Sequence, residues 1–149
     1  MPLQLAAPVY KTFELEETDE TYEVDEATTV TIKQAAQYEH ERRQQLFSTL
    51  ERKFKELEPD EIILVQTLST EELKRLEVWL TLVECNILDM DGNPLFPSKE
   101  NKDGHSRLAM TNTAFVKAWG MLQPDVADEI HNKVLEVNQR WAGTVGEEL

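Results

Sequence analysis

The stretch STEELKRLEVWLTLVECNIL, residues 69–88, carries the clearest fold signal in the chain. Ser69 and Glu72 have the spacing of a capping box, in which each side chain accepts a hydrogen bond from the backbone N–H group of the other residue. The apolar residues that follow recur at spacings of three and four, as on one face of a helix: Leu73, Leu76, Leu80, Val83 and Ile87. We therefore predict a helix from about residue 70 to residue 88, with Trp79 widening its apolar face.

Three further helices are predicted around this stretch. The apolar residues at helical spacing before it predict a helix over 34–57, which Pro59 ends: Leu46, Leu50, Phe54 and Leu57. After it, short helices are expected over 112–120, capped by Thr111 or Asn112, and over 124–138, opened by Pro124. Residues 62–68, between the helices predicted over 34–57 and 70–88, fit either helical turns or a buried strand. These helices should share one core: Leu46, Leu50, Phe54, Leu73, Leu76, Leu80, Val83, Phe115, Ile130 and Val134.

The start of the chain is strongly acidic. Residues 1–30 hold eight acids and one base, which is 1 − 8 = −7, half of the formal charge of −14 on 149 residues. Apolar residues nevertheless alternate with polar ones in three pairs, the period of a β-strand: Phe13 and Leu15, Tyr22 and Val24, Val30 and Ile32. This pattern predicts two or three short strands. The alternative is a disordered acidic tail, because repulsion and low hydrophobicity oppose folding.

The fold class expected from these elements is mainly α. We predict a small helical domain of four to five helices over 27–142, an acidic segment with short strands over 1–26 and a flexible tail over 143–149. Residues 1–20 should be disordered or held only by the helix predicted over 34–57, which is the basic part of the chain, or by a second copy. Residues 89–94 should form a turn and residues 97–107 a mobile loop, since both are rich in polar residues and glycine.

Composition argues against several classes of partner. A protein that grips nucleic acid needs clustered Lys and Arg, so a charge of −14 disfavours DNA and RNA, and anionic membranes for the same reason. No apolar run approaches the roughly 18–20 residues of a membrane span, and residues 1–13 lack the pattern of a signal peptide. We therefore expect a cytoplasmic protein that binds neither nucleic acid nor membrane.

No catalytic or metal-binding pattern stands out. The three His, at positions 40, 105 and 131, lack zinc-ligand spacing to one another or to the single Cys85. The segment from Asp89 to Gly92 suggests a calcium loop, but with Gly92 at position six the twelfth position would be Ser98 instead of Glu. We predict no catalytic residue, metal or cofactor, and hence no enzymatic activity.

Four segments taken together resemble the tail assembly chaperones of long-tailed bacteriophages. They are VTIKQAAQYEHERRQQL at 30–46, WLTLVECNIL at 79–88, DMDGNPLF at 89–96 and TAFVKAWGMLQPDVADEIHNKVLEVNQRWAG at 113–143. The resemblance implies a protein of the host cytoplasm that binds the phage tape-measure protein and assists assembly of the tail-tube protein around it. It implies no particular binding residues, because this family has no motif that can be matched here.

Aromatic side chains are the natural candidates for such contacts, because they dominate protein interfaces. Trp141, Trp119, Phe96 and Trp79 are predicted to contact the partner, with Trp141 first because it lies near the end of the chain. For each of them ordinary core packing is the alternative. A homo-oligomer is also compatible with the sequence. Two other functions stay open: a structural virion adaptor or head–tail completion protein, and an acidic inhibitor that mimics DNA.

Overall fold

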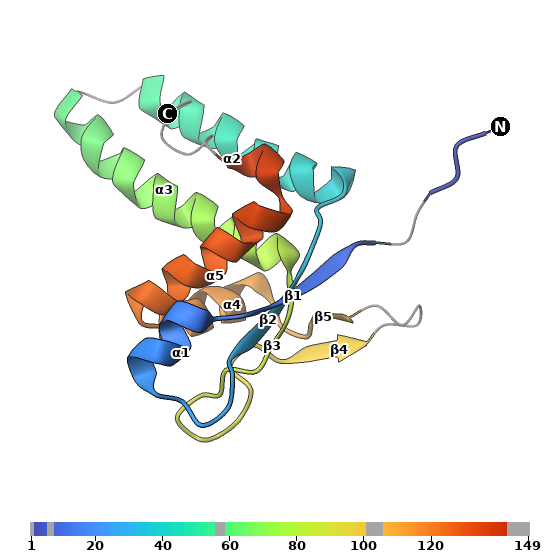
Figure 1. Cartoon of the computed structure of the whole chain (residues 1–149). Helices are drawn as coiled ribbons and strands as arrows, with labels where there is room; N and C mark the ends of the chain where they lie inside the picture. Colours follow the sequence, from blue (N-terminus) through green and yellow to red (C-terminus); the bar gives the residue numbers. More distant parts are fainter. Residues whose placement is uncertain (1, 6–7, 56–58, 101–105, 143–149) are drawn as a thin grey trace.

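The computed structural model describes residues 2–5, 8–55, 59–100 and 106–142, and it combines a small antiparallel sheet with five α-helices in that part of the chain (Figure 1). In chain order the elements are β1 Tyr10–Glu14, α1 Glu16–Tyr22, β2 Thr29–Lys33, α2 Gln37–Lys55, α3 Pro59–Thr81, β3 Leu82–Cys85, β4 Ser98–Glu100, β5 Ser106–Leu108, α4 Asn112–Trp119, α5 Pro124–Val137 and the 3₁₀ turn Gln139–Trp141. The helical content agrees with a mainly α protein, and the sheet adds a second layer.

The three-stranded sheet has the order β1-β2-β3, and both pairs are antiparallel. Val30 and Ile32 of the central strand face the core and are buried. On the opposite face the hydroxyls of Thr12 and Thr31 hydrogen-bond at 2.8 Å. A sheet with one apolar and one polar face is typical of antiparallel strands that cover a core on one side.

The helices cover the apolar face of this sheet. Six predicted core residues are buried: Leu73, Leu80, Val83, Phe115, Ile130 and Val134. Leu76 packs against the core and is partly buried, whereas the side chains of Leu50 and Phe54 lie outside the described part of α2. The buried apolar residue of α2 is Phe47, not Leu46. Among the described side chains of α2, Leu46 is only partly buried.

The predicted helix over 70–88 is wrong at both ends. The helix α3 begins at Pro59, so Ser69 and Glu72 lie inside it, and segment 62–68 is helical. It ends at Thr81, where the chain enters β3. Val83 and Cys85 are buried and alternate with exposed Glu84, so the apolar spacing also fits a strand. Pairing with β2 decides in favour of the strand.

The acidic start is folded where the structure describes it. β1 and β2 match two of the three predicted strand pairs, but the third pair, Tyr22 and Val24, lies at the end of α1. Leu15 is fully buried in the same core cluster as Ile130. Because β1 pairs directly with β2, the predicted boundary at residue 26 is no boundary in the structure, and the disordered-tail alternative fails for these residues.

In the second half of the chain one predicted feature is confirmed and another is wrong at its ends. The side chain of Thr111 accepts a hydrogen bond from the backbone N–H of Ala114 at 3.2 Å, which confirms the cap of α4. The predicted mobile loop over 97–107 is wrong for its ends, because β4 and β5 pair there as a short antiparallel ladder. Residues 101–105 and the predicted tail over 143–149 lie outside the described residues.

Candidate protein-binding site

The aromatic residues predicted as contacts are mostly core residues. Phe96, Trp119 and Trp141 are 0%, 6% and 2% exposed, so in this structure they offer a partner almost no surface. Phe96 and Trp119 pack on the ring of Phe115, with centroids 5.5 Å and 5.9 Å away. Trp79 is half-buried and packs on the same ring. These rings bury a large apolar area within the core, which accounts for their presence without any partner.

Trp141 is held by α2. Its indole Nε1 donates a hydrogen bond to Nδ1 of His40 at 2.9 Å, and the guanidinium carbon of Arg43 lies 5.3 Å from the ring centroid. Burial, followed by the positive charges of Arg140 and Arg43, lowers the pKa of His40 despite the opposing charge of Glu39. His40 is therefore kept in the neutral form that can accept the Trp141 hydrogen bond.

A buried polar cluster, which the sequence analysis did not find, joins α2, α3 and α5. Glu77 is fully buried, and its two oxygens contact Nε of Arg43 and Nε2 of His131, each at 2.8 Å. These residues lie 34 and 54 positions apart in the sequence, so no local pattern brings them together. Each polar partner compensates the loss of water around the others, and the cluster binds three helices to one another.

The surface carries a mostly apolar groove of about 800 Å³. It lies between α1, α4 and the turn after β3, at the end of the molecule away from α2 (Figure 1). We call it the α1–α4 groove and define it by its lining: Thr18, Tyr22, Val24, Thr28, Ile87, Leu88, Asp89, Met90, Asp91, Leu95, Met110, Ala114, Lys117, Ala118, Met121, Leu122, Gln123 and Val126.

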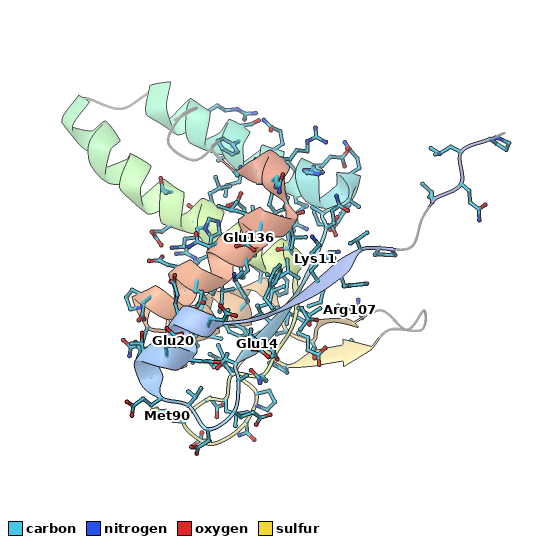
Figure 2. The ribbon with its side chains drawn as sticks, in the orientation of Figure 1. Lys11, Glu14, Glu20, Met90, Arg107 and Glu136 are labelled. Carbon is cyan, nitrogen blue, oxygen red and sulfur yellow. The ribbon has the colours of Figure 1, made fainter. Side chains whose placement is uncertain are left out.

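Exposed apolar side chains gather in the α1–α4 groove. Ten large hydrophobic residues of the described chain are exposed, and five of them line it: Tyr22, Val24, Leu88, Met90 and Met121. Met90 is completely exposed, and Figure 2 places it at the outer end of its turn. Scattered exposed apolar residues are ordinary, but a contiguous group in a concave site is typical of a binding surface.

Helix α1 forms one wall of the groove and is held in place by α5, which is far from it in the sequence. Leu15 at its N-terminus offers no side-chain cap. Instead Glu129 of α5 accepts hydrogen bonds from the backbone N–H groups of Glu17 at 3.2 Å and Thr18 at 2.9 Å, and from the hydroxyl of Thr18. A carboxylate at this end satisfies N–H groups that a helix leaves free. A seven-residue helix, too short to be stable alone, is thereby fixed to the body.

The opposite wall is a tight turn. Oδ1 of Asp89 accepts hydrogen bonds from the backbone N–H groups of Asp91 at 2.9 Å and Asn93 at 3.0 Å. Gly92 has φ of +82°, a conformation that side chains with a Cβ rarely adopt. The turn holds Met90 outward, so its exposed side chain belongs to a rigid loop.

The rim of the α1–α4 groove is acidic. Asp89 and Asp91 face Lys117, which is the one cation among the described lining residues. The chain between α1 and β2 adds three more exposed acids: Glu23, Asp25 and Glu26. Asp125 accepts a hydrogen bond from the hydroxyl of Tyr22 at 3.0 Å, and this bond, with burial and the charge of Asp125, raises the pKa of that tyrosine. The groove therefore offers an apolar floor inside a negative rim.

A second groove, of about 820 Å³, lies beside β1 and the start of α2. Half-buried Trp79 borders it, together with Tyr38, Arg42 and Arg107. Trp79 is thus the one predicted contact residue placed at a groove. The other three line neither groove.

The single cysteine, Cys85, is buried. Burial raises the pKa of the Cys85 thiol to about 11, which keeps it protonated and unreactive near neutral pH. No three His, Cys, Asp or Glu side chains of the described chain converge as a metal site would require, and none of its helices is long and apolar enough to cross a membrane.

The chain matches no family model, no curated protein and no solved structure at a significant level. The fold and the groove describe a mainly α domain that carries a small antiparallel sheet and an apolar groove with an acidic rim.

Proposed function

We propose that this protein is a non-enzymatic binding protein that holds an apolar segment of a partner in the α1–α4 groove. The observation that carries the proposal is the gathering of five exposed apolar side chains in one concave site. Three methionines in the lining, Met90, Met110 and Met121, favour a partner that varies in shape, because the unbranched thioether adapts to different neighbours.

The charge of the rim specifies the partner further. An amphipathic helix of about 10 Å diameter would place its apolar face on the groove floor and its flanking side chains at the rim. Because the rim carries Asp89, Asp91 and the acids at 23–26 against Lys117, helices with flanking Lys and Arg fit best. The net charge of −14 would keep such a complex soluble by repulsion between copies.

The particular role that we propose is that of a phage tail assembly chaperone. Its partner would be the tape-measure protein, a long helical chain, around which it would help tail-tube subunits assemble in the host cytoplasm. This assignment rests on the sequence resemblance, and the groove supplies a physical means for the binding step.

Co-expression with the tape-measure-like protein of the same genome, followed by centrifugation, tests the proposal. The wild-type protein should keep the partner in the supernatant. Leu88→Asp should move the partner to the pellet, because it places a carboxylate on the groove floor without touching the core. Val116→Asp is the matched control, since Val116 is an exposed apolar residue of α4 outside the groove lining. A partner that is equally soluble alone, or with Leu88→Asp, would contradict the proposal.

A structural virion adaptor could use the same groove. The two roles differ in whether the protein remains in the finished particle. A chaperone leaves before the particle is complete, whereas an adaptor stays. Mass spectrometry of purified particles should therefore find no copy of this protein. Its presence in stoichiometric amount would favour the adaptor.

A further inference from the structure

The strand β1 forms an open edge of the sheet. Within the described chain β2 is the one element that packs extensively on β1, whereas β3, at the other edge, is covered by β5. The side chains of Lys11, Thr12 and Glu14 are exposed along β1, and Figure 2 shows Lys11 and Glu14 along this strand. An uncovered edge strand offers backbone groups that can pair with another chain.

The hydrogen-bond pattern shows which backbone groups face outward. The N–H of Leu15 donates to the carbonyl of Thr28, and the N–H of Gln34 donates to the carbonyl of Val9, both at 2.9 Å. In an antiparallel pair such residues alternate along the strand. Odd-numbered residues of β1 therefore bond to β2, and the backbone groups of Thr12 and Glu14 point away from it.

An apolar arm precedes this edge. Residues 2–5 run away from the body (Figure 1), and residues 8–9 lead into β1, where the carbonyl of Val9 already accepts a hydrogen bond from Gln34. Leu3 and Leu5 are 93% and 88% exposed, and Val9 is also exposed. The arm carries no acid, since the first one in the sequence is Glu14. A strongly acidic protein thus has one uncharged apolar segment next to its open strand.

We propose that β1 pairs with β1 of a second copy, antiparallel and centred on Thr12, so that two sheets join into one of six strands. This register uses the outward backbone groups: Thr12 lies opposite Thr12 of the second copy, and Glu14 lies opposite Tyr10. On the other face of the pair Lys11 lies opposite Phe13. No two like charges are opposed, which is the condition for a stable cross-strand pair. The pairing leaves the α1–α4 groove open and does not depend on the function proposed for it.

The charges outside the paired strands also favour this arrangement of two copies. Each arm would pass beyond Glu14 of the other copy and run beside its acidic helix α1, where an arm without acids meets no repulsion. The two α1 helices begin four residues from the axis on opposite sides, which at roughly 3.4 Å per residue separates them by about 27 Å. That exceeds the Debye length of about 8 Å at physiological salt, so their mutual repulsion is screened.

The test is to measure the dimerisation constant of the full chain by sedimentation equilibrium, for the wild type and for a proline variant at position 12. Thr12→Pro removes the outward N–H group and the hydroxyl contact with Thr31, but it spares the backbone ladder with β2 while it weakens the new pair. It should weaken dimerisation about 10- to 100-fold, because two hydrogen bonds across the axis are lost. Thr12→Ala, which loses the hydroxyl contact but keeps the N–H, should still dimerise.

Hydrogen exchange supplies a readout that needs no variant. The N–H groups of Thr12 and Glu14 should exchange slowly at high micromolar concentration and fast on dilution. A chain that stays monomeric at high micromolar concentration, with fast exchange at both residues, would overturn the proposal. A dimer abolished by Leu88→Asp but kept by folded Thr12→Pro would overturn it too, since the groove would then be the interface.

Discussion

The two ends of this molecule distribute polarity in opposite ways. Where α2, α3 and α5 meet, the buried residues include the charged pair of Arg43 and Glu77. At the other end, the α1–α4 groove exposes apolar residues such as Leu88 and Met90 to solvent. The buried charges are compensated within the chain, whereas the exposed apolar groove has no partner in it. The helical end thus stabilises the fold, and the uncovered groove supports our proposal that the other end binds a partner.

The largest effect should come from breaking the buried cluster. Glu77→Ala leaves Arg43 buried beside Phe47 and Trp141 without its carboxylate, and we expect a loss of about 3–5 kcal/mol in the free energy of unfolding. Urea denaturation measures it. Glu136→Ala is the control, because Glu136 is exposed and makes only a long ion pair with Lys133, and it should change stability by less than about 0.5 kcal/mol. Equal effects would mean that the cluster is not a stabilising unit.

Variants of Trp141 give a second test of how much the helical end contributes to stability. Trp141→Ala should lower the free energy of unfolding by about 3 kcal/mol, because the indole is 2% exposed and leaves a cavity against α2. Trp141→Phe keeps most of the volume and loses the bond to His40, so about 1 kcal/mol is expected. Thermal melts of both variants measure the difference. An unchanged melting temperature for Trp141→Ala would restore Trp141 as a surface contact.

Some of this architecture could be predicted from sequence, because its causes are local. The cap at Thr111 and the opening of α5 at Pro124 depend on neighbouring residues, and both were predicted correctly. The strand β3 was missed because the apolar spacing of residues 80–87 fits a helix and a strand equally well, and only pairing with β2 separates them. Predictions of this kind fail where a distant segment decides the local structure.

The groove and the buried cluster could not be predicted for the same reason. Helix α1 has no side-chain cap of its own, and the carboxylate that caps it lies more than 100 residues away, in Glu129. The groove wall built on α1 therefore exists only in the folded molecule. Aromatic content singled out Trp79, which the structure places at the border of the second groove, and its role as a contact stays a prediction. It misled for Trp141, because a large ring near the end of a chain can equally be its last core residue.

The free energy of unfolding should depend on pH through His40 at the helical end of the molecule. His40 has a pKa below its ordinary value of 6.5 in the folded protein, so the unfolded chain binds the proton more readily. The stability that neutral His40 contributes is therefore complete above about pH 6.5 and is lost as the pH falls below it. Urea denaturation between pH 7.5 and pH 5 measures the loss. His40→Asn should remove this part of the pH dependence, and an unchanged profile would exclude the bond between His40 and Trp141 as its source.

The smallest effect on stability is expected in the groove. Met90 is completely exposed on a turn held by Asp89 and Gly92, so Met90→Ala removes no buried contact and should change the free energy of unfolding by less than about 0.5 kcal/mol. Asp89→Ala is the contrast at the same turn, because it loses two hydrogen bonds to the backbone and should cost about 1–2 kcal/mol. In the co-expression assay Met90→Ala should nevertheless reduce the amount of soluble partner, since the exposed thioether is part of the apolar lining of the groove. If Met90→Ala destabilises the fold as much as Asp89→Ala does, the side chain is packed and the groove is not open. If it changes neither stability nor partner solubility, the binding surface lies elsewhere on the groove or on the second groove at Trp79.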